Sequence, residues 1–321
     1  MRVPAASGQA APRDRHLRIE KLRVPGGSLI AHFAPGAGMV GCSLRHDGVE
    51  LLGILGAIDA YLDRGSVFGI PLLHPWANRL GGWTYAVAGR TVRLDRGSPL
   101  LHGDAHCLPI HGAVAAGSDW QVTRTGADER AAWLEAELDW AAHADLLEIF
   151  PFAHRVSMAI TLRRDVLRIE STVHATGGTP VPVSFGFHPY LAPPGAPRER
   201  WHVELPALTH LPLDRLALPT GAREPRPAER FELGRRTYDD LFAVDGGAAR
   251  FAVSDGVRRI VVELEAGYPY AQVFAPPDQP VICFEPMTAP VDALRSHDGL
   301  VCVDSGRSTT AAFALRVEPA A

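Results

Sequence analysis

Lysine is almost absent from this chain of 321 residues: Lys21 is the only one, and arginine carries the remaining basic charge. Catalysis through a lysine Schiff base would depend on this one residue near the N-terminus, and we do not expect it. Cysteine is also scarce, with Cys42, Cys107, Cys283 and Cys302 far apart and without a CxxC pair. In a chain of this size, that spacing indicates buried free thiols rather than disulfides or a zinc site.

Long apolar segments are missing too. No segment approaches the roughly 20 apolar residues of a membrane-spanning helix. Residues 1–15 are rich in alanine, proline, glycine and arginine and lack the apolar centre of a signal peptide. We interpret residues 1–15 as a flexible N-terminal leader and expect a cytoplasmic protein.

A strong excess of charge of either sign is absent as well. The formal net charge is −4, and the arginines are scattered rather than clustered. This distribution predicts neither a nucleic-acid partner nor binding to an anionic membrane. A small neutral ligand fits the composition better, and we expect a monomer or homodimer.

The clearest positive signal is an alternation of apolar and polar residues with period two. It runs over 156–162 and 167–173, on either side of an Arg164-Asp165 turn, and predicts a β-hairpin with one buried face. The same alternation recurs in three further segments, at 134–138, 260–264 and 311–317. Strands are therefore expected from one end of the chain to the other.

Helical periodicity is not sustained anywhere, and 27 prolines and 31 glycines interrupt the chain at short intervals. Residues 85–94 indicate another hairpin, which turns at Ala88-Gly89. The chain is therefore predicted to be all-β, with two large packed antiparallel sheets and few short helices, in a single domain over 16–321. Two segments rich in proline and arginine, 192–200 and 219–231, are predicted to be long surface loops.

Two motifs that could hold a cofactor or a metal lack the context they need. Residues 36–41 match GxGxxG, but a dinucleotide site requires a helix to begin there, and Asp47-Gly48 indicates a turn a few residues later. Three histidines, His102, His106 and His111, could bind a metal in a cupin-like barrel. The carboxylate ligand that usually accompanies such histidines does not follow them at short range. We predict neither cofactor nor metal and keep the metal site as a minor alternative.

Four other segments place polar or ionisable residues in apolar surroundings: 71–79, 110–112, 185–190 and 283–290. A carboxylate such as Glu285 loses hydration there, so that its pKa rises or it needs a partner. Taken singly, Glu285 could pair with Arg79, and His188 could be a core histidine. Together with His111 and Asn78, they supply the acid, base and hydroxyl-binding groups that a sugar pocket needs.

These segments occur in the order found in the aldose 1-epimerase (galactose mutarotase-like) superfamily, which the chain resembles from about residue 17 to 318. The matching segments are PLLHPWANRL, IHG, GFHPY, YDDLF, AQVFAP and FEPMTAPVDAL. The resemblance implies the galactose mutarotase-like supersandwich, a large antiparallel β-sandwich. This agrees with the fold class predicted from the alternation.

The resemblance also implies roles for individual residues. His188 of GFHPY matches the family's general acid, and Glu285 of FEPMTAP matches its general base. Substrate-binding positions are implied for Asn78, Arg79, His111, Asp239 and Gln272. For the aspartate of YDDLF we prefer Asp239 to Asp240, because its spacing to Phe242 fits the family better.

The implied activity interconverts the α and β anomers of an aldose without a cofactor. Glu285 takes the proton of the C1 hydroxyl while protonated His188 donates to the ring oxygen, and the roles reverse when the ring closes on its other face. Proximity of the two groups is expected to favour the charged form of each.

The identity of the sugar substrate is not determined, because HPWANR and FEPMTAP differ from the corresponding segments of galactose mutarotases. These usually carry a tyrosine-containing segment before the Asn-Arg pair and a Glu-Thr-Gln run around the base. The alternatives are a hexose-6-phosphate 1-epimerase and a non-catalytic sugar-binding domain of the same fold. Trp76 could stack on a sugar, but we expect it to pack in the core.

Overall fold

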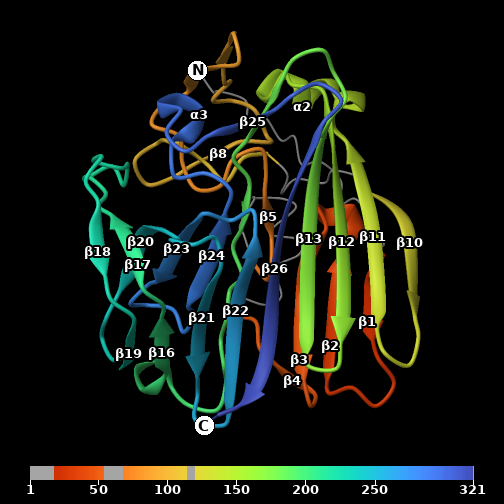
Figure 1. Ribbon diagram of the computed structural model, residues 1–321, viewed down its shortest axis with the longest axis vertical. Coiled ribbons are helices and arrows are strands. Elements are labelled where there is room, and N and C mark those ends of the chain that lie inside the picture. The colour runs from red at the N-terminus through yellow and green to blue at the C-terminus, as the bar shows by residue number, and fades with distance from the viewer. Residues whose placement is uncertain (1–17, 54–67, 114–119, 321) are drawn as a thin grey trace, which may run out of the picture.

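The computed structural model describes residues 18–53, 68–113 and 120–320, and a nine-stranded antiparallel sheet is its largest layer (Figure 1). In spatial order its strands are β10 (Gln121–Ala127), β11 (Ala132–Asp139), β12 (His154–Arg163), β13 (Val166–Ala175), β26 (Ser308–Pro319), β22 (Arg258–Ala266), β21 (Ala249–Ser254), β16 (His202–Leu205) and β19 (Glu229–Glu232). The hairpin predicted around Arg164-Asp165 is confirmed as β12–β13. The three further alternating segments lie in β11, β22 and β26.

A seven-stranded antiparallel sheet carries Asp239, Gln272 and Glu285, and His188 directly follows one of its strands. Its order is β18 (Glu224–Arg226), β17 (Leu208–Leu211), β20 (Tyr238–Ala243), β23 (Tyr270–Ala275), β24 (Cys283–Met287), β15 (Gly186–Phe187) and β5 (Leu72–Leu73). A four-stranded sheet is formed by β1 (Glu20–Arg23), β2 (Leu29–Ala34), β3 (Val40–His46) and β4 (Val49–Glu50). The all-β, antiparallel class is thus confirmed.

Smaller elements complete the described fold. Three two-stranded pairs are β6 (Thr84–Val87) with β7 (Arg90–Arg93), β8 (His102–Gly103) with β9 (Pro109–Ile110), and β14 (Val181–Val183) with β25 (Val301–Val303). The helices are α2 (Ala144–Ile149) and α3 (Ala293–Ser296), and the 3₁₀ turns are η1 (Pro35–Ala37), η2 (Trp140–Ala142) and η3 (Arg198–Arg200). Ala88 and Gly89 both have positive φ, so that the predicted β6–β7 turn has the backbone typical of a tight hairpin.

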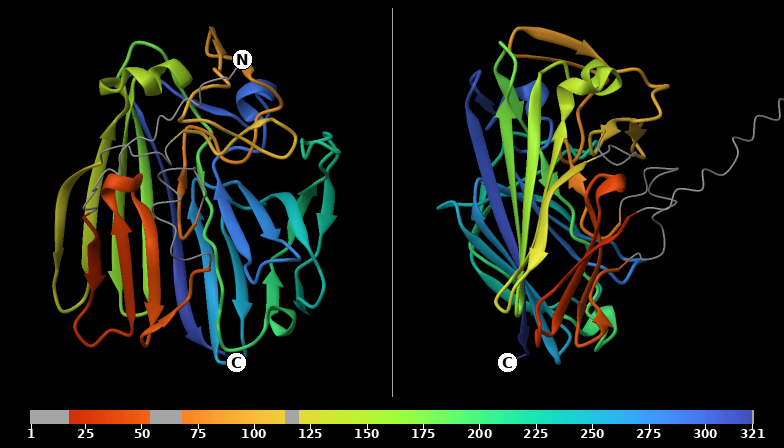
Figure 2. Two further views of the ribbon diagram at one scale, coloured as in Figure 1. Left: turned by 180° about the vertical axis from the view of Figure 1, so that it is seen from behind. Right: turned by 90° about the vertical axis from the view of Figure 1, so that its right-hand side faces the viewer.

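The sheets stack as a sandwich. β1 and β2 pack on β11 and β12, and Figure 2 shows the red-to-orange strands β1–β4 against the yellow-green half of the nine-stranded sheet. The seven-stranded sheet covers the other half through ring contacts. Phe187 of β15 lies 5.0 Å from Phe313 of β26, and Phe284 of β24 lies 5.4 Å from Phe251 of β21, measured between ring centroids. The apolar core therefore lies between the layers.

The prediction of a surface loop over 219–231 is wrong in part. Residues 224–226 form β18 at one edge of the seven-stranded sheet, and 229–232 form β19 at one edge of the nine-stranded sheet. Pro225 lies within β18. Proline has no N–H to donate, but an edge strand tolerates it because only one side of the strand is paired. Of the other predicted loop, 192–200, only Arg198–Arg200 forms a regular turn.

Three further expectations have mixed outcomes. All four cysteines are free, but burial holds for Cys283 alone, since Cys42 is half-buried and Cys107 and Cys302 are exposed. The GxGxxG segment forms the single 3₁₀ turn η1 and then enters β3, so that no α-helix begins there. The leader predicted at 1–15 lies outside the described residues. Among the described helices, none is long and apolar enough to cross a membrane.

Phe313→Ala tests the packing between the two large sheets. Phe313 is fully buried and touches both Phe187 and Tyr268, so we expect a loss of about 3–5 kcal/mol in the free energy of unfolding. Urea unfolding measures this. Phe231→Ala, at the edge strand β19, is the control and should cost less; a loss below about 1 kcal/mol for Phe313→Ala would contradict the packing described here.

Candidate functional site

The strand alternation directs a row of polar side chains away from the nine-stranded sheet. Phe284 of β24 faces β21, so that Glu285 points to the opposite face of its own sheet. In the same way Phe187 faces β26, and the next residue, His188, has the opposite direction. The outer face of the seven-stranded sheet therefore carries both groups.

His188 and Glu285 are in direct contact on this face. The Nε2 atom of His188 lies 3.2 Å from Oε1 of Glu285, although 97 residues separate them in the sequence. The residues are 5% and 1% exposed. Two ionisable groups therefore meet in surroundings that exclude bulk water, where proton transfer between them and a bound molecule is feasible.

Aromatic rings fix the His188 imidazole. Tyr190 stacks on it with a centroid distance of 4.2 Å and an interplanar angle of 10°, and Phe274 and His111 approach edge-on at 5.7 and 5.6 Å. With one face of the ring covered by Tyr190, rotation of the imidazole is restricted. The family resemblance had assigned no role to Tyr190, although it lies within the same GFHPY segment.

Burial shifts the two pKa values in opposite directions. Burial raises the pKa of Glu285 well above its usual value, nearby Asp239 raises it further, and Arg79 opposes the shift. Burial lowers the pKa of His188 well below its usual value, and His111 adds to this. The expectation that proximity favours both charged forms is therefore wrong, because the loss of hydration is the largest cause of both pKa shifts.

Gln272 and Asp239 extend the polar row across the sheet. The ladder between β23 and β24 places Gln272 opposite Glu285. The Nε2 atom of Gln272 donates to Oδ1 of Asp239 over 2.6 Å. Asp239, Gln272 and Glu285 thus form one continuous line on three adjacent strands.

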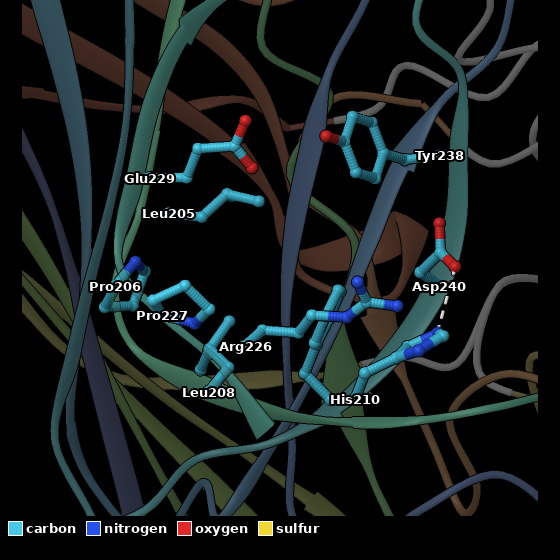
Figure 3. A pocket seen from close by; sticks show the side chains of 10 residues that line it. Leu205, Pro206, Leu208, His210, Arg226, Pro227, Glu229, Tyr238 and Asp240 are labelled. Carbon is cyan, nitrogen blue, oxygen red and sulfur yellow. Dashed lines mark hydrogen bonds and ion pairs between the residues drawn. The ribbon is translucent and has the colours of Figure 1, made fainter. Parts of the chain in front are cut away.

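Asp240 faces the other side of β20 and belongs to a separate pocket at the edge of the sandwich (Figure 3). Its Oδ1 atom lies 3.1 Å from Nε2 of His210, and Phe242 also lines this pocket. Because alternate residues of a strand point to opposite faces, Asp239 is the aspartate that shares the face of Glu285.

A loop after β5 brings Asn78 and Arg79 to the same region. Asn78 adopts a positive φ, which asparagine tolerates better than most residues, and its carbonyl accepts from the N–H of His111 over 2.7 Å. Burial lowers the pKa of His111 to about 3, and the Arg79 charge adds to this. His111 is therefore neutral near neutral pH, and it can form hydrogen bonds with a ligand but carries no positive charge.

Asp104 is a site residue that sequence reasoning missed. Its Oδ2 accepts from Nε of Arg79 over 2.8 Å, and its Oδ1 accepts from the backbone N–H groups of His106 and Leu108. Burial alone would raise the pKa of Asp104, but the hydrogen bonds from Leu108 and Arg79 lower it overall. The carboxylate fixes the direction of the Arg79 side chain.

Several polar atoms of this site have no hydrogen-bond partner among the described residues. They are Nδ1 of His111, Nδ1 of His188, Oε1 of Gln272 and Oε2 of Glu285. Buried polar atoms are normally paired, so unpaired atoms on one face indicate a surface built for a polar ligand. Donors and acceptors are both present, as recognition of hydroxyl groups requires.

The alternatives from the sequence fit less well. Within the described ranges, no group of three or more His, Cys, Asp or Glu side chains is arranged to hold a metal ion, and His106 is exposed. Trp76 is fully buried and contacts Tyr85 edge-on in the core, as expected. It therefore packs in the interior.

Asp104→Asn tests the buried ion pair with Arg79. The amide keeps an oxygen for the backbone N–H groups but presents no anion to Arg79, so we expect a loss of about 1–3 kcal/mol in unfolding free energy. Asp214→Asn is the matched control, because Asp214 accepts from Leu216 and Leu218 in the same way, and among the described residues no arginine is hydrogen-bonded to its carboxylate. Equal losses in chemical denaturation would contradict a stabilising ion pair at Asp104.

Known proteins share the family and the fold of this chain. The family model for aldose 1-epimerase matches residues 34–316. A galactose mutarotase-like protein from Clostridium acetobutylicum is 19% identical with a TM-score of 0.79, covering 95% of this chain and 99% of that one. A Synechocystis protein is 23% identical with a TM-score of 0.76, covering 95% and 97%.

A galactose 1-epimerase from Lactobacillus acidophilus is 15% identical with a TM-score of 0.75, covering 95% of this chain and all of that one. At these identities the solved structures establish the fold, the galactose mutarotase-like sandwich. No curated protein sequence matches the chain. Because the family model spans most of the sequence, from β2 to β26, the chain belongs to the aldose 1-epimerase family.

Proposed function

We propose that the protein interconverts the α and β anomers of an aldose by opening and reclosing the sugar ring. The observation that carries the proposal is the buried contact between His188 and Glu285, 3.2 Å apart, with an unpaired atom on each side chain. Family membership supports an isomerase that acts on sugars. The reaction needs one acid and one base within reach of adjacent oxygens, and this pair offers both.

The pKa shifts suit this chemistry because the pair keeps one proton. Burial disfavours the positively charged form of His188 and the negatively charged form of Glu285. The two groups together therefore hold one titratable proton near neutral pH. The shifts favour the shared proton on Glu285 at rest, and it passes across the 3.2 Å contact to His188 before ring opening. His188 then gives it to the ring oxygen as the bond between C1 and that oxygen breaks, while the C1 hydroxyl gives its proton to Glu285. The pair holds one proton before and after this step, so its total charge does not change in the buried site.

The remaining residues then orient the sugar. In this proposal, neutral His111 and the Arg79 guanidinium contact the ring oxygen or hydroxyl groups. Asn78, whose carbonyl accepts from the N–H of His111, lies beside them. Asp239 and Gln272 supply acceptors and a donor on the far side of Glu285. Rotation about C1–C2 requires that these contacts hold the rest of the open chain while the aldehyde turns.

Glu285→Gln and His188→Asn should each lower kcat by about 10²–10⁴, because each removes one partner of the proton transfer. Exchange between anomers, followed by NMR or polarimetry on several free aldoses, measures the rate. Glu263→Gln and His174→Asn make the same exchanges on β22 and β13 and should leave the rate unchanged.

Near-normal exchange by Glu285→Gln would contradict the assignment. The same assay with 6-phosphorylated aldoses separates a hexose-6-phosphate 1-epimerase from an enzyme of free sugars. Sugar binding by the wild type without faster exchange would favour a binding domain of this fold.

The pH dependence of kcat/KM should form a broad plateau across neutral pH. Activity should fall on the acid side when His188, whose pKa is lowered, gains a proton while Glu285 is still protonated. It should fall on the alkaline side when the raised pKa of Glu285 is passed and the shared proton is lost. Rates measured from acid to alkaline pH test this; a midpoint at the usual pKa of histidine, about 6.5, would contradict it.

A further inference from the structure

A second pair of buried imidazoles lies outside the proposed catalytic pair. His74 directly follows β5 of the seven-stranded sheet, and His154 begins β12 of the nine-stranded sheet. Their Nε2 atoms lie 2.8 Å apart, and the residues are 3% and 0% exposed. This hydrogen bond therefore joins the two large sheets without any contact with solvent.

The surroundings determine which nitrogen of each ring carries the proton. Nδ1 of His154 lies 2.6 Å from the carbonyl oxygen of Phe152, which can only accept, so this nitrogen is the donor. In a neutral ring, Nε2 of His154 is then an acceptor, and Nε2 of His74 must carry the hydrogen. Nδ1 of His74 is left as a bare lone pair, and it has no partner among the described residues.

Both rings are neutral near neutral pH. Burial lowers the pKa of His154 to about 4, against opposing effects of the Phe152 carbonyl and Asp139, and burial also lowers that of His74. A proton on Nε2 of His154 would place two N–H groups against each other over 2.8 Å, and a proton on Nδ1 of His74 would bury a charge without a partner among the described residues. Between two neutral rings, the hydrogen bond thus exists in one arrangement only.

Aromatic rings hold the pair in place. Trp140 stacks on His154 at 5.1 Å and meets His74 edge-on at 4.9 Å, and its Nε1 donates to the carbonyl of Phe150. Phe150 and Phe185 approach His74 from other sides. Neither imidazole can turn without displacing several buried rings.

His74 is tied through its backbone to the segment that carries His111. Its carbonyl accepts from the N–H of Ala113 over 2.8 Å. Gly112 forms a bridge with His74, with positive φ and so close that an added Cβ would lie 2.3 Å from the His74 carbonyl oxygen. Asn78, four residues after His74, accepts from His111. The segments 74–79 and 110–113 therefore form one unit.

We propose that the His74–His154 hydrogen bond positions this unit, and with it three proposed sugar-binding residues, over the catalytic pair. These residues are Asn78, Arg79 and His111. His74 and His154 touch no proposed catalytic atom and act as positioning residues. The inference rests on the proposed function only for its kinetic test, since the arrangement of protons can be observed in the resting protein.

Imidazole ¹⁵N NMR of the wild type tests the arrangement of protons directly. We expect His74 to carry its hydrogen on Nε2 and His154 on Nδ1, both neutral across neutral pH. A charged ring, or the opposite tautomer of either residue, would overturn the inference whether or not the protein turns over sugars.

Two substitutions at His74 test the positioning role. His74→Phe keeps the ring shape without the donor, and KM should rise about tenfold while kcat changes less than about threefold. His74→Gln keeps an N–H near the position of Nε2 and should restore KM to within about threefold of the wild type. His174→Phe, which removes a half-buried imidazole bonded to Ser308 on β26, is the control and should leave KM unchanged.

An unchanged KM in folded His74→Phe would overturn the proposal, as would loss of kcat at constant KM. Failure of His74→Gln to restore KM would do the same, and this variant decides the matter if His74→Phe does not fold. Absence of turnover in the wild type would instead count against the proposed function. In that case, sugar dissociation constants of the same variants replace KM.

Discussion

The burial of two ionisable side chains against each other is the constraint on which the site depends. His188 and Glu285 meet at 3.2 Å on the outer face of a sheet whose inner face is filled by phenylalanine rings. Removing water makes each charge costly, so one neutral pair is favoured over two independent ions. The sandwich provides this environment because strand alternation separates an apolar face from a reactive one at every second residue.

Much of the fold follows from local pattern, since period two is visible in β11, β12, β13, β22 and β26 without knowledge of their partners. The strands that the local pattern did not predict are β18 and β19. Both are short edge strands that pair on one side only, and their residues are mostly proline, arginine and glutamate. Their sequences therefore show little alternation of apolar and polar residues. An edge strand is specified by the neighbour it joins, which lies elsewhere in the chain.

The site shows the same division between local and distant information. Polar residues in apolar segments identified His188, Glu285, Arg79 and His111 as unusual, but their proximity came from the family resemblance alone. Asp104 was missed because its own segment, LHGDAHCLPIHG, gives no sign that it pairs with Arg79, which lies 25 residues earlier in the chain. The protonation of the pair was also beyond sequence reasoning, because proximity and burial act in opposite directions and only the extent of burial decides between them.

The neighbouring aspartates of β20 have a consequence for how this surface can change. Asp239 joins the row beside Glu285, while Asp240 pairs with His210 in the pocket behind the same strand. Neighbours in sequence thus serve the two opposite faces of a single strand. A substitution at one can change its own face and leave the chemistry of the other unchanged, provided the strand keeps its register. A slip by one residue would move each acid to the opposite face, so an insertion here would disturb both faces at once.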